Sequence, residues 1–200
     1  MNGQESIRPE KTGAQTDESH LKETKIDSEE IFSGRIMHIQ RDHVRLVDGS
    51  VTTREVLRHT GAACVIPITA DGQVLMVRQW RYPVDQALLE IPAGKLDHEK
   101  EAPLDAAKRE LREETGAVAG QWYDLGVFYG APAYTDEAVH IYAAKDLTMG
   151  EQHLDQGEFL DCTSVPLEKL VQMALQGELP DGKTQLAVLK LAELRRRGIF

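Results

Sequence analysis

The chain has 200 residues, of which 41% are hydrophobic, so it can form one compact domain with a small extension. Its formal net charge of −10 argues against general binding to nucleic acid or to an anionic membrane. The apolar runs are all shorter than the ~20 residues that a membrane-spanning helix requires, and residues 1–30 lack the apolar segment of a signal peptide. We therefore expect a cytoplasmic protein in which Cys64 and Cys162 are buried free thiols.

The N-terminal part of the chain divides into a tail and a set of strands. Residues 1–28 are polar and carry almost no large apolar side chains, so we expect a disordered tail there. Residues 29–58 alternate apolar and polar side chains, which predicts a small antiparallel sheet. Asp48-Gly49 lies between two such runs and predicts a hairpin turn. The strands are expected near residues 36–40, 44–47 and 51–58.

Residues 59–200 combine short apolar strands with helices and form the second expected domain. The helix predicted at residues 102–115 has Pro103 in its first turn and Gly116 directly after its end, which are the positions these residues favour. Two more helices are expected at residues 167–176 and 183–197. The strands are expected at residues 62–69, 74–81, 88–91, 123–129, 139–144 and 158–162. This mixture predicts an α/β sandwich.

Three glutamates gather in the last turns of the first predicted helix. Glu110 and Glu114 are four residues apart and therefore share a face, with Glu113 beside them. Like charges at this spacing repel one another, so such a face is either solvated or binds a cation. Carboxylate oxygens suit Mg²⁺, which prefers a few hard ligands together with water and substrate phosphates. Arg109 precedes Glu113 by four residues and is placed to hold an acidic side chain.

The same helix and the loop before it carry a longer motif. Its members are Gly94, Glu101, Arg109-Glu110-Leu111, Glu113-Glu114 and Gly116-Ala117. This motif resembles the box of the Nudix hydrolase family. The spacing from Glu101 to Arg109 fits the family pattern, whereas the loop at residues 97–100 contains one residue more than the pattern allows. With so many fixed positions, this resemblance is far more specific than a lone glycine motif.

Other segments resemble the ADP-ribose pyrophosphatase subfamily of Nudix hydrolases. They are residues 32–35, 78–82, 90–95, 134–137 and 179–189, together with Pro132. The resemblance implies a Nudix-type α/β/α sandwich with a mixed sheet, preceded by the small N-terminal antiparallel sheet. It also implies a homodimer with the sheet of residues 31–58 at the interface, in which each subunit helps to form the nucleotide site of the other.

The resemblance further implies a magnesium site, in which Mn²⁺ can substitute for Mg²⁺. The expected ligands are the carbonyl oxygen of Ala93 and the side chains of Glu110, Glu114 and Glu158. Glu113 and Arg109 are expected to support catalysis from beside them. In the subfamily a late acidic loop supplies the general base. Here that loop reads Asp155-Gln156-Gly157-Glu158, so Glu158 is the first candidate and Asp155 the second.

The implied reaction is hydrolysis of ADP-ribose to AMP and ribose 5-phosphate. Among the expected substrate contacts, Arg81 is the strongest cation by resemblance, and Phe32 is placed to stack on adenine. The full set is Phe32, Arg54, Arg81, Pro132 and Glu137. The alternatives are another nucleoside diphosphate sugar such as GDP-mannose, RNA cap removal, and a nucleotide-binding sensor without turnover. The net charge argues against RNA, and the retained glutamates argue against the sensor.

Overall fold

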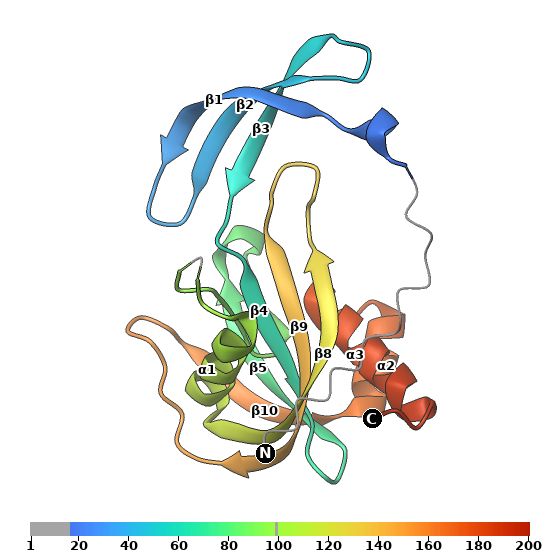
Figure 1. Cartoon of the computed structure of the whole chain (residues 1–200). Coiled ribbons are helices and arrows are strands. Elements are labelled where there is room, and N and C mark those ends of the chain that lie inside the picture. Colours follow the sequence, from blue (N-terminus) through green and yellow to red (C-terminus); the bar gives the residue numbers. More distant parts are fainter. Residues whose placement is uncertain (1–16, 99) are drawn as a thin grey trace. The chain divides into compact units, whose positions relative to one another are not determined.

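The computed structural model describes residues 17–98 and 100–200 of the chain. These residues form two compact units (Figure 1). The larger unit consists of Gly61–Gly130 and Ala138–Phe200, and the smaller one of residues 17–60 and Ala131–Glu137. Because a short segment of the smaller unit is inserted between the two parts of the larger one, the units do not correspond to a single cut in the chain.

The larger unit is built on a four-stranded mixed sheet in the order β7-β4-β9-β8. β4 (Ala62–Pro67) runs parallel to β9 (Ala138–Met149) and antiparallel to β7 (Ala93–Lys95). β8 (Ala117–Tyr129) runs antiparallel to β9 and begins before the expected residue 123. A second, antiparallel sheet has the order β10-β5-β6. Its strands are β5 (Gln73–Arg81), β6 (Gln86–Glu90) and β10 (Leu160–Pro166).

Helices cover both faces of the mixed sheet (Figure 1). Successive side chains of its central strand β4 point to opposite faces, so each face carries an apolar layer on which a helix packs. Val65 of β4 packs in one layer with Leu111 of α1 (Pro103–Thr115). Ile66 packs in the other layer with Leu191 of α3 (Gly182–Arg196). α2 (Leu167–Gln176) contributes Leu170 to the same layer as α3. The predicted α/β/α sandwich with a mixed sheet is confirmed, and each fully buried side chain of this size contributes roughly 1.5–3 kcal/mol.

The smaller unit is a three-stranded antiparallel sheet in the order β1-β2-β3, as predicted. The hairpin turn between β2 (His38–Arg45) and β3 (Val51–Arg58) contains Asp48-Gly49, and Gly49 adopts a positive φ of 86°. The two separate strands expected at residues 36–40 and 44–47 form one strand, β2. The segment Ala131–Glu137 joins β3 through a bridge between Thr135 and Leu57.

The predicted end of the tail at residue 28 is wrong. A 3-10 helix, η1 (Ser19–Leu21), and strand β1 (Thr24–Ser33) both begin earlier. Every residue of β1 is exposed, so this strand is held by main-chain pairing with β2 and not by burial. A prediction that relies on apolar side chains therefore misses it. Residues 1–16, the remainder of the predicted tail, lie outside the described residues.

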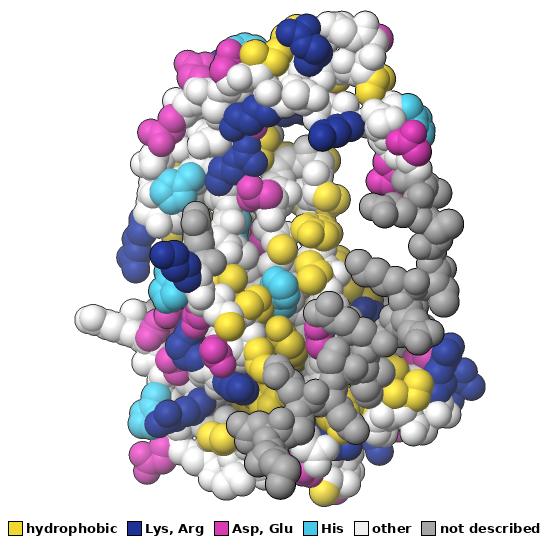
Figure 2. Space-filling model, viewed as in Figure 1, with side chains coloured by type: hydrophobic (Ala, Val, Ile, Leu, Met, Phe, Trp, Pro, Cys, Tyr) yellow, Lys and Arg dark blue, Asp and Glu magenta, His cyan; other side chains and the backbone are white. Residues whose placement is uncertain are grey.

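The surface of the described residues is mixed in charge. Figure 2 shows Asp and Glu side chains interspersed with Lys and Arg side chains on the face in view. Cys64 is buried as expected, but Cys162 on β10 is exposed, which corrects the prediction of two buried thiols. Both cysteines are free. Within residues 17–98 and 100–200, no helix combines the length and the apolar character that crossing a membrane requires.

Candidate active site

The acidic face of α1 packs directly against the short strand β7. The main-chain N–H of Ala93 donates a hydrogen bond to Oε2 of Glu114 over 3.1 Å. At the next residue, a Cβ on Gly94 would overlap the carboxylate of Glu110, so a glycine is required for this close approach. The structure thus brings three predicted site residues, Ala93, Glu110 and Glu114, to one point in the larger unit.

The C-terminal end of α1 is joined to the loop that carries Glu158. Gly116 ends the helix with a positive φ of 72°, and a Cβ there would overlap the carbonyl oxygen of Gly150. The N–H of Gly150 donates in turn to the Gly116 carbonyl at 2.8 Å. Three residues further, the N–H of His153 donates to the carbonyl of Glu113 at 2.9 Å. These main-chain bonds fix the start of the loop on the helix end.

Arg109 connects the acidic side chains around the box. Its guanidinium donates to Glu110 at 2.6 Å and to Glu113 at 3.2 Å, so the contact predicted from the spacing is present. The same group donates to Glu101 at 3.2 Å and to the carbonyl oxygen of Lys95 at 3.2 Å. Glu101 therefore lies in this network despite the extra residue in the preceding loop. Glu99, also in that loop, lies outside the described residues.

Glu114 is a buried carboxylate and Glu110 a partly buried one, and neither has its charge fully compensated. Glu114 is only 2% exposed. Burial raises its pKa to about 8, and the neighbouring negative charges of Glu110 and Glu158 raise it further than the Ala93 hydrogen bond lowers it. Burial also raises the pKa of Glu110, to about 7, although Arg109 opposes that shift. Two such carboxyl groups side by side favour either a shared proton or a bound cation.

Glu158 belongs to the same cluster. Its Oε1 accepts a hydrogen bond from Nε2 of Gln79 on β5 at 3.3 Å. Its charge contributes to the raised pKa values of Glu110 and Glu114, which places it within electrostatic reach of both. Asp155, the second candidate for the general base, accepts a hydrogen bond from the Glu158 N–H through its main-chain carbonyl.

The chemistry of this donor set fits Mg²⁺. Within residues 17–98 and 100–200, no three His, Cys, Asp or Glu side chains are already arranged as a metal site. Mg²⁺, however, is commonly held by one or two carboxylates and keeps several waters. Glu110 and Glu114 offer such oxygens beside the main chain of Ala93, and a divalent cation would relieve their mutual repulsion.

A second group of buried charges lies in the same unit, centred on Glu90. Glu90 is 1% exposed and accepts hydrogen bonds from Arg81 at 2.7 and 2.9 Å. It also pairs with the ammonium of Lys183, which lies 3.0 Å from Asp181. Burial alone would raise the pKa of Glu90, but Arg81 and Lys183 hold it below its usual value. The predicted substrate residue Arg81 is thus part of a compensated network.

Neither Glu90 nor Lys183 was predicted as a site residue, although Glu90 lies in a segment that carries the family resemblance. A sequence signal for Glu90 does exist, because it is a lone acidic residue that directly follows the apolar pair Leu88-Leu89. A buried acid requires a buried cation. Lys183 offers no comparable signal, since a lysine in the first turn of a helix is ordinarily solvated.

Four predicted substrate residues lie in the smaller unit. Phe32 on β1 is 54% exposed. Arg54 on β3 forms an ion pair with Glu23, with contacts of 2.6 and 3.0 Å, so its guanidinium already has a partner. Glu137 lies 3.8 Å from the imidazole of His59, and Pro132 lies in the same inserted segment.

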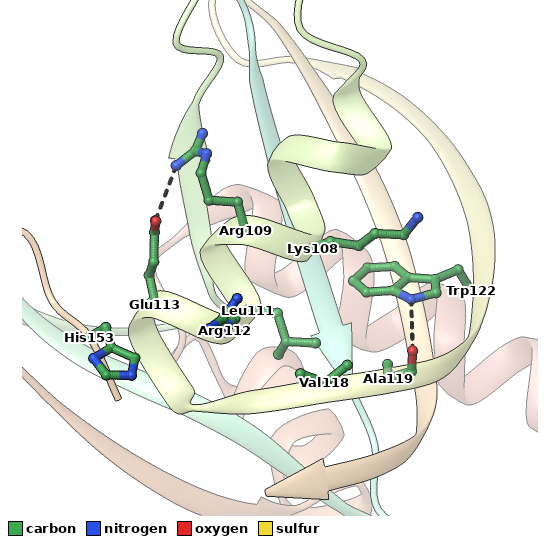
Figure 3. A pocket seen from close by; sticks show the side chains of 9 residues that line it. All are labelled: Lys108, Arg109, Leu111, Arg112, Glu113, Val118, Ala119, Trp122 and His153. Atoms are coloured by element: carbon green, nitrogen blue, oxygen red, sulfur yellow. Dashed lines mark hydrogen bonds and ion pairs between the residues drawn. The ribbon is translucent and has the colours of Figure 1, made fainter. Parts of the chain in front are cut away.

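A cavity of about 640 Å³ lies beside α1 and is shown in Figure 3. Arg109 and Glu113 are the only predicted site residues that line it, and neither Glu110 nor Glu114 does. Its other lining residues are Lys108, Leu111, Arg112, Val118, Ala119, Trp122 and His153. The indole of Trp122 and the exposed side chain of Lys108 border the cavity (Figure 3).

Comparison with known families agrees with this geometry. The NUDIX domain matches residues 57–186, and the nucleoside diphosphate sugar hydrolase N-terminal domain matches residues 23–57. The second match begins close to the start of β1 and includes the three-stranded sheet except for Arg58, the last residue of β3. The chain belongs to the Nudix hydrolase family, and it is a pyrophosphohydrolase of the nucleoside diphosphate sugar group.

Individual relatives cover most of the chain. The ADP-ribose pyrophosphatase of Bacillus subtilis is 38% identical over 170 residues, which are 84% of this chain and 91% of that protein. The methanol dehydrogenase activator of Bacillus methanolicus is 41% identical over the same shares. A crystal structure of an ADP compounds hydrolase has a TM-score of 0.77 at 22% identity, covering 90% of this chain and 98% of the other. GDP-mannose pyrophosphatases also match, at lower identity.

Proposed function

We propose that this Nudix hydrolase cleaves the diphosphate of ADP-ribose to AMP and ribose 5-phosphate, with Mg²⁺ or Mn²⁺ as cofactor. The observation that carries the proposal is that two glutamates of α1 contact β7. Glu114 accepts a hydrogen bond from the main chain of Ala93, and the carboxylate of Glu110 lies against Gly94. Relatives named ADP-ribose pyrophosphatases, at 35–38% identity, support the choice of the nucleotide sugar.

In this proposal Glu110, Glu114 and the carbonyl oxygen of Ala93 hold the metal, with Glu158 as a further ligand or as the base. When bound, the metal neutralises the diphosphate and lowers the pKa of the attacking water. Arg109 fixes the carboxylates of Glu110 and Glu113 so that they do not reorganise during the reaction.

Glu158 is our candidate for the general base. It follows a loop that is fixed on the end of α1, and Gln79 orients its carboxylate. In that role one oxygen accepts the proton of water while the water oxygen forms a bond to phosphorus and the sugar or nucleoside phosphate leaves. Asp155 remains the second candidate in the same loop.

Arg81 is the substrate cation of the larger unit. Its positive charge helps to lower the pKa of Glu114, so the two groups lie within electrostatic reach of each other, which supports this role. Phe32, Arg54, Pro132 and Glu137 in the smaller unit remain predicted substrate contacts. Arg54 would have to exchange its ion pair with Glu23 for a phosphate.

A substrate panel tests the proposal directly. The protein is incubated with Mg²⁺ and ADP-ribose, GDP-mannose, UDP-glucose or NAD⁺, and the products are quantified by phosphate release after phosphatase treatment. We expect ADP-ribose to have the highest kcat/KM. A higher value for GDP-mannose would favour the second candidate, which the GDP-mannose pyrophosphatases among the relatives support. Binding of ADP-ribose without products would instead support the nucleotide sensor.

We also propose that the protein is a homodimer with the sheet of residues 31–58 at the interface. Large apolar side chains of this sheet are exposed in a single chain, among them Ile31, Phe32 and Val51. Such a surface is favourable when a second copy covers it. Light scattering of the pure protein should give twice the mass of one chain, and a stable, active monomer would contradict the proposal.

A further inference from the structure

The network around Glu90 links the start of helix α3 to Arg81. Lys183, in the first turn of α3, pairs with Glu90, and Glu90 receives Nε and Nη2 of Arg81. Asp181, the N-cap of α3, accepts hydrogen bonds from the N–H and the hydroxyl of Thr184 at 3.1 and 2.5 Å. The Thr184 hydroxyl oxygen accepts from the N–H of Ile91, the residue after Glu90. The helix start and the strand end are thus joined twice.

This network holds one edge of the Arg81 guanidinium and leaves another edge available. Two of its three nitrogens are used by Glu90, and within the described part of the chain no partner is found for Nη1. The side chain of Arg81 is 38% exposed, whereas that of Glu90 is 2% exposed. The guanidinium therefore extends from a buried carboxylate toward solvent.

The charges of the network balance. Arg81 and Lys183 carry two positive charges, and Glu90 and Asp181 carry two negative charges. Without Lys183, the only cation left for the buried carboxylate of Glu90 would be Arg81, and the network would have a net negative charge. A diphosphate approaching Arg81 would then meet a repulsive field in a site that is already acidic.

We propose that Lys183 is a positioning residue for the substrate: by compensating Glu90 it keeps Arg81 fixed, with its free Nη1 edge available to an oxygen of the substrate diphosphate. Lys183 does not touch the substrate in this arrangement and acts through Glu90 and Arg81. The inference deepens the proposed function and rests on it, because it takes a nucleoside diphosphate sugar as the ligand of Arg81.

Substitution of Lys183 tests the inference. Lys183→Met removes the charge while retaining most of the apolar stem, and Lys183→Arg keeps the charge. We expect Lys183→Met to raise KM at least ~10-fold with kcat within ~3-fold, since the loss of uniform binding acts on KM. Lys183→Arg should restore KM to within ~3-fold of the wild-type value. If Lys183→Met does not fold, Lys183→Gln replaces it.

Lys190 provides a matched control on the same helix. Its ammonium donates to the carbonyl oxygen of Leu125, so Lys190→Met also loses a hydrogen bond of a partly buried lysine. We expect a lower melting temperature with unchanged KM. If Lys190→Met raised KM as much as Lys183→Met, the effect of Lys183→Met would be explained by lower stability of the protein, and the inference would be overturned.

A double-mutant cycle identifies the route of the effect. If Lys183 acts through Arg81, the pair Arg81→Lys and Lys183→Met should raise KM no further than Arg81→Lys alone. Additive effects would overturn the inference.

Equilibrium binding of the α,β-methylene analogue of ADP-ribose gives the same comparison without turnover. If the wild type neither cleaves nor binds any nucleotide sugar, the proposed function itself fails. A wild-type KM in Lys183→Met, in an active enzyme, overturns only the role of Lys183.

Discussion

Two clusters of buried carboxylates lie in the larger unit and differ in how their charge is compensated. Glu90 has two cations in contact, Arg81 and Lys183, and its pKa lies below the usual value despite burial. Glu114 has a main-chain N–H in contact and carboxylates for neighbours, and its pKa rises to about 8. Both side chains are at most 2% exposed, so burial alone does not account for the difference.

The comparison indicates what each cluster is suited for. A compensated cluster is complete in the folded chain and can fix an arginine. In the second cluster Arg109 compensates Glu110 only in part, and the remaining repulsion between Glu110 and Glu114 would be relieved by a proton or a further cation. This difference is the basis of our proposal that Glu110 and Glu114 hold the metal and that Glu90 holds Arg81 in position.

Removal of metal should have the largest effect. With excess EDTA we expect turnover to fall at least ~1,000-fold, because the metal supplies several kcal/mol of transition-state stabilisation. Thermal unfolding should remain cooperative, since the compensated cluster and the apolar core do not depend on metal. Addition of Mg²⁺ should restore the rate. Undiminished turnover in EDTA would refute the metal assignment.

Substitution within the cluster of Glu110 and Glu114 comes next. Glu114→Gln keeps the size of the side chain and removes its charge, so kcat should fall at least ~100-fold, on the scale of losing one strong electrostatic group at the reacting centre. Glu168→Gln on the exposed face of α2 is the control and should retain the wild-type rate. Steady-state assays on both variants suffice, and an active Glu114→Gln would show that the box residues are not used as proposed.

The same substitution in the two clusters should change stability in opposite directions. Glu90→Gln removes the counter-charge of the half-buried Arg81 and one of the two counter-charges of Lys183, which keeps Asp181, so the unfolding free energy should fall by about 2 kcal/mol. Glu114→Gln removes repulsion and should stabilise the metal-free protein or leave it unchanged. Urea denaturation in EDTA measures both. Equal destabilisation by the two variants would remove the distinction between the clusters.

The raised pKa values predict a smaller, pH-dependent effect. Burial raises the pKa of Glu110 to about 7 and that of Glu114 to about 8 in the folded chain, above the ordinary value of about 4.5 for a glutamate in the unfolded chain. Between those limits the folded state binds more protons, so metal-free stability falls as pH rises from 5 to 8. We expect the melting temperature in EDTA to fall steadily over that range. Mg²⁺ should reduce the loss, and a flat profile in EDTA would contradict the assigned pKa values.

The mixture of predicted strands and helices indicated an α/β sandwich, and the spacing of the glutamates on one helix face indicated a cation site, because both depend on local patterns. The mixed sheet and the expected ligands Ala93 and Glu158 came from the resemblance to the Nudix family. The limits of α2 coincide with the prediction, and the contact of Arg109 with Glu113 follows from helical spacing alone. Gly94 was expected to allow a tight loop, and the structure adds that its missing Cβ makes room for Glu110.

Features that depend on pairing between distant segments could not be predicted in the same way. Every residue of strand β1 is exposed, so its side chains give no apolar pattern from which a strand could be predicted. Its pairing with β2 determines that this segment forms a strand. Lys183 and Glu90 are 93 residues apart and meet only because α3 starts beside the end of β6. Arg54 was expected to be available to substrate, but Glu23, in the predicted tail, pairs with it.

The most direct test of the central claim is a count of the protons released when metal binds. Metal-free protein at pH 7 is titrated with Mn²⁺ in a calorimeter, in two buffers that differ in ionisation enthalpy. Because the pKa of Glu114 is about 8 and that of Glu110 about 7, Glu114 is largely protonated at pH 7 and Glu110 about half protonated. Wild-type protein should therefore release about one proton on binding, and Glu114→Gln less than half as many. Binding without proton release, or equal release from Glu114→Gln, would contradict the account.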